Sequence, residues 1–580
     1  MATGIDSPAP HQHVDLDGSK LDRGVGFWGL LWASEGSLIG SGWLFGALTA
    51  ASIAGPSAII AWVIASVIVI LLALVHAELG GMFAVSGGTS RFPHYAFGGF
   101  AGATFGWFSY IQAATVAPIE VLAAIQYMST ASWASGLYNG SNNTLTASGV
   151  WMAVALMVFF VILNLVGVRW LSRFNSTLTI WKVGLPILAV IVLMSVSFHS
   201  HNFSAAGGFF VHGAELKSIL IAIPSGGIVF AMLGFEQAVQ LGGEARNPSR
   251  DLPLAVITSI LLAAVLFILI QVAFIGALEP KLLAQAHTWT NLSDAATMKQ
   301  NPDLEALNKG PFWQVASLAG LGWLAILLRI DAVLSPGGTG LIYVTTSSRL
   351  TFGLSRNGYL PRAFEWTSGR SKVPWFGVLV TAVIGLLFLL PFPSWNKLVG
   401  VVTSASVMMY AGAPLAFGAL RLQKPELPRP FRLPWGSVLS PIAFIFANFI
   451  IYWSGWQTYT TLMAVMIIGA ILIGVSMALK LNPAVPEMDW QGAIWVLPYL
   501  VGLGVISYFG GFGSGGIIGG VGVFSDVWVG GKGALGLWWD MLVLAIFSLV
   551  IYYGAMQYRL TPQKVEAMIA AVHVEPVEAH

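Results

Sequence analysis

The chain has 580 residues, of which 56% are hydrophobic and only 9% are charged, and its formal net charge is +2. Soluble domains carry about 25% charged residues, so a soluble fold of this length would lack polar surface, and we expect a polytopic membrane protein. The small net charge argues against a nucleic-acid partner, and the absence of cysteine excludes disulfides, thiolate metal sites and a cysteine nucleophile.

A helix needs about 20 apolar residues to cross the hydrocarbon core of a bilayer. A scan at that length predicts an all-α bundle of about fourteen spans, without the short alternating segments of a membrane barrel. The expected spans cover 26–50, 56–82, 98–128, 150–168, 175–197, 218–240, 252–277, 312–346, 375–391, 397–420, 437–457, 459–480, 492–510 and 536–556.

Lysine and arginine residues near the ends of these spans are unevenly distributed. If the N-terminus is placed inside the cell, most of the 27 lysine and arginine residues lie on the inner side. Cytoplasmic loops of membrane proteins carry an excess of these residues, so this orientation is the expected one. We therefore expect a multi-pass protein of the cell (inner) membrane with both termini in the cytoplasm. The polar N-terminal segment lacks the basic-then-apolar order of a signal peptide and is expected to be a solvated tail.

The first expected span contains the stretch "LIGSGWLFG" at 38–46, in which three glycines and a serine interrupt an apolar helix. Glycine costs roughly 1 kcal/mol relative to alanine inside a helix, and in lipid every freed backbone group must find a partner. Close packing of helices through small residues is one explanation. The other is a discontinuous helix whose unwound backbone binds a ligand at the membrane midplane, as in secondary transporters.

A second interrupted span lies five spans later. Ser225, Gly226 and Gly227 interrupt the segment 218–240, Gly234 interrupts it again, and Glu236 follows. Packing alone does not readily explain two interrupted spans at this offset. They predict a 5+5 inverted repeat with broken helices 1 and 6, which is the architecture of a secondary transporter.

Four motifs in this order resemble those of the amino acid–polyamine–organocation (APC) superfamily of transporters, over about residues 25–480. They read "IGSGWLFG", "AELGGMFAVSGGTSRFPHYAFG", "FAMLGFEQAVQLGGEARNPSRDLP" and "SSRLTFGLSRNGYLPRAF". The stretches "LGWLAILLRIDAVLSPGG", "PFPSWNKLVG" and "IYWSGWQT", with two additional C-terminal spans, resemble the 14-helix branch of aspartate–proton symporters.

The resemblance implies a LeuT-like transport core with an appendage. The expected parts are an N-terminal tail (1–24), inverted repeat one (25–200), inverted repeat two (201–425), helices 11 and 12 (426–485), the extra helices 13 and 14 (486–558) and a C-terminal tail (559–580).

The two broken spans are the expected substrate site. Unwinding in span one frees backbone N–H groups that suit an anion, and the positive end of a helix helps to hold it. The resemblance places an amino acid carboxylate on Ser41 and Gly42, with Leu38 and Gly40 beside them, and the ammonium group near the freed carbonyls of span six. The implied residues of span six are Phe230, Ala231, Met232, Leu233 and Gly234. Phe230 matches an aromatic gate of the family, with ordinary bundle packing as the alternative.

Charged residues inside a membrane cost several kcal/mol and suggest function. Glu78 ends span two, where we expect a gate or a structural ion pair. Glu236 follows the break in span six, and either a gating role or a satisfied packing carboxylate is expected.

Four other charged residues lie within the expected spans: Glu35, Glu120, Arg329 and Asp331. Residues two apart on a helix face different directions, so Arg329 and Asp331 should have different partners. Arg329 could neutralise Glu35 or Glu120, or it could bind a substrate side-chain carboxylate. The segment that begins at Ser335 and contains Pro336 is expected to distort span eight.

Lys182 lies about two turns inside span five, in "LTIWKVGLPILAVIVLM". It could extend toward the cytoplasmic interface. The resemblance implies instead that its ammonium group replaces a sodium ion between spans one, five and eight. Burial disfavours the charged form of a lysine, so protonation of Lys182 could couple transport to the proton.

Together these features predict an amino acid permease that works by proton symport with alternating access, with an aspartate-like substrate. The excess of intramembrane carboxylates favours a neutral or cationic substrate instead, and exchange rather than symport is an alternative, as is a non-transporting nutrient sensor. A membrane-embedded enzyme is disfavoured because no HExxH-like metal motif occurs. The expected partners are a small amino acid and the lipid bilayer, with no cofactor besides the coupling proton and no obligatory protein partner.

Overall fold

The computed structural model describes residues 24–571 except 86, 141–142, 167, 369–372, 390–394, 485 and 514–529. Most of the expected N-terminal tail (1–24) and the last part of the expected C-terminal tail (559–580), from residue 572, lie outside these residues.

The described part of the chain is helical apart from one two-stranded hairpin. The N-terminal half contains α1 (Phe27–Leu38), α2 (Ser41–Ala54), α3 (Ala58–Met82), α4 (Gly88–Phe97), α5 (Gly99–Met128), β1 (Tyr138–Asn139), β2 (Thr144–Leu145), α6 (Ala147–Val166), α7 (Val168–Val196), α8 (Glu215–Ser225), α9 (Ile228–Ala231), α10 (Gln237–Gln240) and α11 (Pro248–Ala277). The C-terminal half contains α12 (Pro280–Ala286), α13 (Ala295–Gln300), α14 (Pro302–Lys309), α15 (Pro311–Leu318), α16 (Gly322–Arg356), α17 (Trp375–Leu389), α18 (Trp395–Gln423), α19 (Gly436–Trp453), α20 (Trp456–Ala478), α21 (Val496–Phe509), α22 (Leu537–Tyr558) and α23 (Pro562–Ala571).

Ten described segments are long and apolar enough to cross a membrane. They are Ser41–Met82, Gly99–Met128, Ala147–Leu165, Leu178–Val196, Pro248–Ala277, Gly322–Arg356, Leu398–Gln423, Gly436–Trp453, Trp456–Ala478 and Leu537–Tyr558, and Trp375–Leu389 and Val496–Phe509 are shorter apolar helices. The chain is therefore a polytopic helical membrane protein. The expected first and sixth spans are divided into short pieces, α1 and α2 in one case and α8, α9 and α10 in the other.

The expected span at 312–346 is wrong in two respects. The helix is divided at Ala319–Leu321, between α15 and α16, where Gly320 has a φ of +75° that an L side chain rarely adopts. Pro336, in the segment that should have distorted the span, lies inside the continuous helix α16. A proline is tolerated inside a membrane helix because neighbouring helices can satisfy the backbone groups that it frees. The residue before it, Ser335, donates its hydroxyl to the carbonyl of Ile39 at 2.9 Å.

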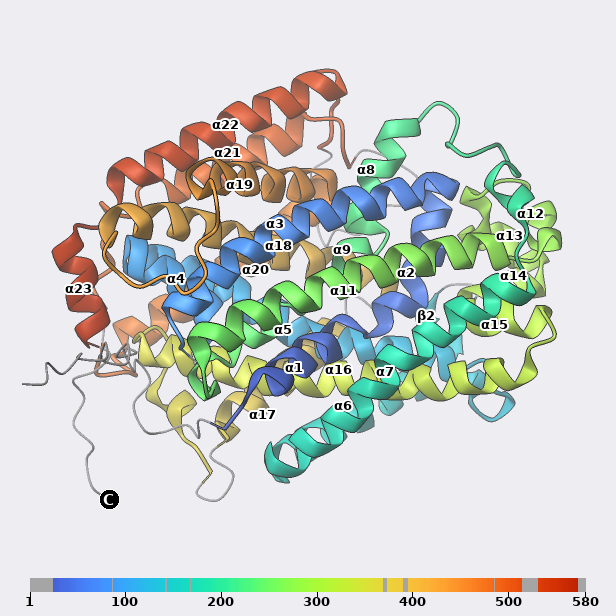
Figure 1. Cartoon of the computed structure of the whole chain (residues 1–580), viewed down its shortest axis with the longest axis horizontal. Helices are drawn as coiled ribbons and strands as arrows, with labels where there is room; N and C mark the ends of the chain where they lie inside the picture. The colour runs from blue at the N-terminus through green and yellow to red at the C-terminus, as the bar shows by residue number, and fades with distance from the viewer. Residues whose placement is uncertain are drawn as a thin grey trace, which may run out of the picture.

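The long helices run in broadly the same direction, from the end that carries α4 and α23 to the end that carries α12 to α15 (Figure 1). Nearly every side chain of α5 is buried, and this helix packs against α16 and α18. A helix that is apolar all round is buried in the middle of a bundle. Glu120, in the C-terminal half of α5, therefore lies in the interior.

The outer faces of the bundle expose apolar side chains. Ile467 of α20 is 61% exposed, Val501 of α21 is 64% exposed and Val550 of α22 is 64% exposed. Exposed apolar faces of this kind suit a lipid environment, because a bilayer solvates them. The polar groups lie on the inward faces of the same helices, as Ser507 and Ser548 show.

The appended helices α21 and α22 attach to α19 through buried hydrogen bonds. Tyr499 of α21 donates to Asn448 of α19 at 2.7 Å, and Asn448 donates to Ser548 of α22 at 2.9 Å. At the other end of the pair, Tyr452 of α19 donates to Asp540 of α22 at 2.7 Å. The three helices therefore form one packed unit, seen along one edge of Figure 1.

The short helix α23 fastens the end of the described chain to α4. The N–H of Leu560 donates to the carbonyl of Ala96, and Lys564 pairs with Asp489 at 2.6 Å. The hydrogen bond that Lys564 donates to Asp489 raises the pKa of Lys564, which keeps this lysine charged. The linker between α20 and α21, which carries Asp489, is thereby held against the same end of the bundle.

Candidate functional site

The predicted interruption of the first span is confirmed. Helix α1 ends at Leu38 and α2 begins at Ser41, with Gly40 in a non-helical conformation between them. A Cβ atom at position 40 would lie 2.6 Å from Oε1 of Glu120 and 2.8 Å from Oγ1 of Thr339. Only glycine fits this close approach of α5 and α16 to the interrupted backbone.

The predicted interruption of the sixth span is confirmed as well. Gly227 has a φ of +79° and begins the single turn α9, and non-helical backbone follows from Met232 to Glu236. Gly234 has a φ of +136°, and a Cβ atom there would lie 2.7 Å from the backbone nitrogen of Leu38. Both glycines supply a backbone conformation that L residues rarely adopt.

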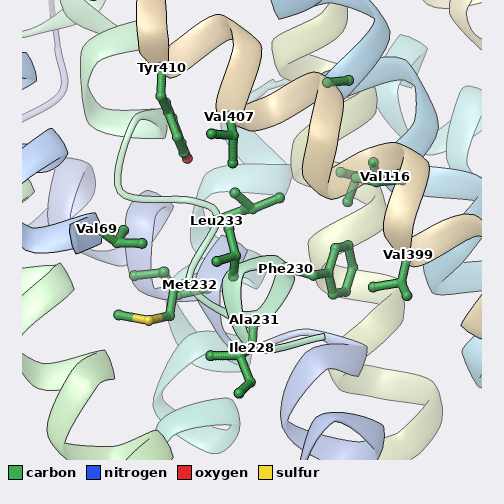
Figure 2. Packing of buried hydrophobic residues seen from close by; sticks show 14 of the residues in the cluster. Val69, Val116, Ile228, Phe230, Ala231, Met232, Leu233, Val399, Val407 and Tyr410 are labelled. Atoms are coloured by element: carbon green, nitrogen blue, oxygen red, sulfur yellow. The ribbon is translucent and has the colours of Figure 1, made fainter. Parts of the chain in front are cut away.

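The two interruptions meet in the centre of the bundle. A Cβ atom at Gly42 would lie only 2.6 Å from Cα of Ala231, so the backbones of α2 and α9 are in direct contact. Figure 2 shows Met232 and Leu233 on the non-helical stretch beside this contact, with Phe230 between Leu233 and Val399.

A small cavity of about 10 Å³ lies between the two interruptions, which is room for about one water molecule. Its walls are formed by Ser37, Leu38, Gly40, Gly42, Val116, Glu120, Phe230, Ala231, Leu233, Thr339 and Tyr343. An amino acid does not fit this volume, so the conformation described is closed around the site. Six of the nine residues predicted to bind substrate line this cavity, and Ser41, Met232 and Gly234 adjoin them in the chain.

Glu120 holds the N-terminal end of α2. Its Oε2 accepts a hydrogen bond of 2.8 Å from the backbone N–H of Ser41, and the side chain is 1% exposed. This N–H is one that we expected to bind the carboxylate of a substrate. The sequence identified both residues but gave no sign that they contact each other.

Lys182 of α7 bridges α1 and α16. Its ammonium group donates to the carbonyl of Gly36 and to Oγ1 of Thr339, the latter at 2.8 Å, and the residue is fully buried. Thr339 in turn donates to the carbonyl of Gly36 at 2.9 Å. The expected contact between spans one, five and eight is therefore present. Reasoning from the sequence missed Thr339 and Ser335, although their spacing of four residues places both on one face of α16.

Asp331 is buried against the aromatic side of the site. Its Oδ1 accepts a hydrogen bond of 2.9 Å from the indole of Trp181, the residue before Lys182. Asp331 and Glu120 both lie close enough to Lys182 to interact with its charge. Two buried carboxylates therefore lie near Lys182.

Arg329 does not neutralise Glu35 or Glu120, and that prediction is wrong. Its guanidinium donates to the hydroxyl and the carbonyl of Thr130, at 3.0 and 2.9 Å, and its Cζ lies 4.3 Å from the ring centroid of Trp313. The position of Arg329, two residues before Asp331 on α16, turns it away from the interior. Arg329 also does not border the cavity at the two interruptions.

Glu35 of α1 is 2% exposed, and no residue that the structure describes donates a hydrogen bond to its Oε1. Glu236 is the opposite case. It accepts from the hydroxyl of Tyr410 at 2.7 Å, from the N–H of Gly234 at 2.9 Å and from the hydroxyl of Tyr343 at 3.3 Å. Glu236 is therefore a satisfied carboxylate that ties the break in span six to α16 and α18.

Trp395, at the start of α18, covers both interruptions and was missed by the sequence reasoning. Its indole donates to the side chain of Ser41 at 2.8 Å, and its ring packs edge-on against Phe230, with centroids 5.7 Å apart. It also packs against Phe45, at 5.3 Å. Phe230 thus packs against an aromatic partner, which is compatible with both expected roles. The signal available was the motif "PFPSWNKLVG", in which Trp395 follows two closely spaced prolines.

Glu78 forms the structural ion pair that was one of its two expected roles. It accepts two hydrogen bonds from Arg421, at 2.9 and 2.6 Å, lies 3.3 Å from Arg429 and accepts from the N–H of Leu433 at 2.7 Å. The side chain of Glu78 is fully buried. It joins the end of α3 to α18 and to the loop that follows α18.

We expect Glu78→Ala to lower the free energy of unfolding by about 3–5 kcal/mol, because removing one partner leaves buried charges uncompensated. The midpoint of thermal unfolding in detergent measures this loss. Glu426→Ala is the matched control, since Glu426 is a largely exposed carboxylate in the same loop and its removal should change stability by less than about 0.5 kcal/mol. Equal midpoints for the two variants would contradict the structural role of Glu78.

No group of three or more His, Asp or Glu side chains in the described ranges is arranged to hold a metal ion. The site is instead built from interrupted helices, backbone groups and one buried lysine. A polytopic helical membrane protein with such a site belongs to the class of membrane transporters.

Comparison with known proteins places the chain within this class. Residues 25–476 match the family model described as amino acid permease, so the chain belongs to the amino acid permease family of the APC superfamily. Members of this family are transporters and not enzymes.

The similarity to individual named proteins covers more of the chain than the family model does. The chain is 35% identical to the glutamate/serine transporter AimA of Bacillus subtilis, over 93% of this chain and 94% of that protein. It is 33% identical to the aspartate-proton symporter of the same organism, over 92% and 96%, and 25% identical to its branched-chain amino acid permease BcaP, over 78% and 92%. The predicted resemblance to the aspartate–proton symporter branch is confirmed.

Proposed function

We propose that the protein is a secondary active transporter that imports an amino acid together with protons by alternating access. The observation that carries this proposal is the buried backbone N–H of Ser41, which holds a carboxylate at the point where the two interrupted helices meet. An amino acid presents the same anionic group, and a helix N-terminus favours it. The carbonyl groups around Phe230 to Gly234 are suited to the ammonium group of the same ligand.

The proton is the proposed coupling ion, and Lys182 is the proposed coupling residue. A fixed ammonium group that bridges Gly36 and Thr339 makes a sodium ion unnecessary between α1 and α16. Loss of its proton would weaken this bridge between the helices, because hydrogen bonds from an uncharged amine are weaker than those from an ammonium group. The name of one relative, aspartate-proton symporter, supports proton coupling.

The proposed architecture is a LeuT-like core with about fourteen membrane-spanning helices. Its two inverted repeats are 25–200 and 201–425. Helices 11 and 12 lie in 426–485, and the two extra helices lie in 486–558. The cytoplasmic tail is 559–580. The interruptions between α1 and α2 and in α8 to α10 support this repeat, because they fall in the expected spans one and six, which would be the first spans of the two repeats. Both termini lie in the cytoplasm, and the protein resides in the inner membrane.

An acidic amino acid such as aspartate is the proposed substrate. The relatives named as aspartate-proton symporter and glutamate/serine transporter support this class. A small neutral amino acid is the second candidate, because Arg329 is engaged with Thr130 and Trp313 and does not border the cavity. Lys182 is then the remaining cation near the site within the described part of the chain.

We expect L-aspartate to displace a bound radiolabelled amino acid far better than L-arginine. The ammonium group of Lys182, which bonds to Thr339 in the wall of the cavity, disfavours a cationic side chain there. Competition of L-aspartate, L-serine, L-alanine and L-arginine on purified protein measures the order. Displacement by serine and alanine but not by aspartate would replace the acidic assignment with the neutral one.

Uptake into proteoliposomes separates the proposed symporter from its alternatives. A symporter accumulates the ligand in empty vesicles when a pH gradient is imposed. An exchanger takes up the ligand only when the vesicles are loaded with substrate, and a sensor binds it without flux.

A further inference from the structure

The carboxylate of Glu120 occupies the position at which the substrate carboxylate is proposed to bind. Its Oε2 lies 2.8 Å from the nitrogen of Ser41, and its Oε1 lies beside Gly40, where a Cβ atom would be 2.6 Å away. The residue is 79 positions away in the chain and is delivered by the buried helix α5. The anion site is therefore already filled by a side chain of the protein.

Two carboxylates cannot share this site while both are charged. Like charges a few ångströms apart in a buried environment repel strongly, and the N–H of Ser41 donates a single hydrogen bond. The cavity beside Glu120 holds about one water molecule, so it leaves no room for a second anion. Binding of a substrate therefore requires that Glu120 leaves this N–H.

We infer that Glu120 is the resident anion of the substrate site, and that an amino acid binds by displacing its carboxylate as that group takes up one proton from water. This inference rests on the proposed function and makes Glu120 a positioning residue for that site. The exchange balances: one proton neutralises Glu120, and the carboxylate of the substrate replaces the lost negative charge. The charge opposite Lys182 is the same before and after.

The neighbours of Glu120 support such an exchange. Lys182 on α7 provides the positive charge, and Asp331 and Tyr343 lie on α16. Glu236, at the break in span six, is held by Tyr343 and Tyr410 and is not bonded to α2. Glu120 is thus the carboxylate on the N–H of Ser41, while Asp331 accepts from Trp181 and Glu236 accepts from the two tyrosines.

The displacement is tested by calorimetry of amino acid binding to the purified wild-type protein between pH 5 and 9. L-aspartate and L-serine are the probes, each measured in two buffers that differ in ionisation enthalpy. We expect binding to take up close to one proton at the higher pH values, and the affinity to fall by up to about tenfold per pH unit there. Uptake of no proton at any pH would overturn the inference.

Glu120→Gln is the matching variant, because the amide oxygen can still accept from Ser41 but carries no charge to displace. We expect its affinity to lose the dependence on pH and to exceed that of the wild type at pH 9. Asp540→Asn is the control: Asp540 is also a buried carboxylate that accepts from a backbone N–H, that of Gly511 at 3.0 Å, but it lies in the appended helices. It should keep the wild-type pH profile.

The outcomes distinguish this inference from the proposed function. If neither amino acid binds to the wild-type protein, the proposed function fails and the inference fails with it. If both wild type and Glu120→Gln bind with the same dependence on pH, the proposed function stands and the inference is wrong. Should the variant not fold, the absence of proton uptake by the wild type still overturns the inference.

Discussion

Replacing Lys182 with alanine is expected to abolish proton-driven accumulation of substrate while leaving binding measurable. The carbonyl of Gly36 accepts hydrogen bonds from the ammonium of Lys182 and from the hydroxyl of Thr339. Of these two donors, Lys182 is the one that can gain or lose a proton, and the substitution removes it. Thr339 still donates to Gly36 at 2.9 Å, so the interruption of α1 should persist. Accumulation is measured in proteoliposomes under an imposed pH gradient without sodium.

Lys182→Met is the volume-matched companion, since it removes the charge without leaving a large cavity. Lys217→Ala is the control, because Lys217 is a lysine of α8 whose ammonium lies over the ring of Phe512, away from the interruptions. We expect both Lys182 variants to fall to the level reached without a gradient and the control to match the wild type. Sodium-dependent uptake by the wild type, or accumulation by Lys182→Ala along the gradient, would contradict coupling through Lys182.

The sequence was sufficient to locate the interruptions of the helices. Glycine at positions 40, 227 and 234 is costly in a membrane helix unless the backbone must bend or be approached closely, and the structure has close approach at the first and positive φ at the other two. Lys182 was recognisable for a similar reason, because an isolated lysine in an apolar helix requires partners. These predictions were possible because each depends on the free-energy cost of placing a single residue type in a membrane helix, which the sequence alone reveals.

The partners of the buried charges were not predictable in the same way. Glu120 contacts Ser41 and Arg329 contacts Thr130 because of how the helices are rotated about their axes. In a soluble protein the polar face of a helix reveals its rotation, but in a bilayer the outward face is apolar as well. The expectation that Arg329 and Asp331 have different partners followed from helical geometry alone, and it is correct.

Introduction of valine at Gly42 is expected to weaken amino acid binding by at least about a hundredfold, or about 2.7 kcal/mol. The first added carbon would lie 2.6 Å from Cα of Ala231 and 2.7 Å from its Cβ, so α2 and α9 must move apart. Backbone atoms on the opposite helix cannot rotate away as a flexible side chain could. The movement would displace the N–H of Ser41 from the carbonyl groups of span six, and the two ends of the ligand would no longer reach both.

Gly46→Ala is the matched control, because it lies one turn along the same helix and its added Cβ would meet no atom closer than Trp62 at 3.6 Å. Gly42→Ala, which adds only the first carbon, should fall between the control and Gly42→Val. Binding is measured by equilibrium titration with radiolabelled L-aspartate or L-serine on variants whose thermal unfolding matches the wild type. If Gly42→Val retains the wild-type affinity, the ligand does not bind where the two interrupted helices meet, because the separation that valine forces on α2 and α9 would have to affect a ligand held between them.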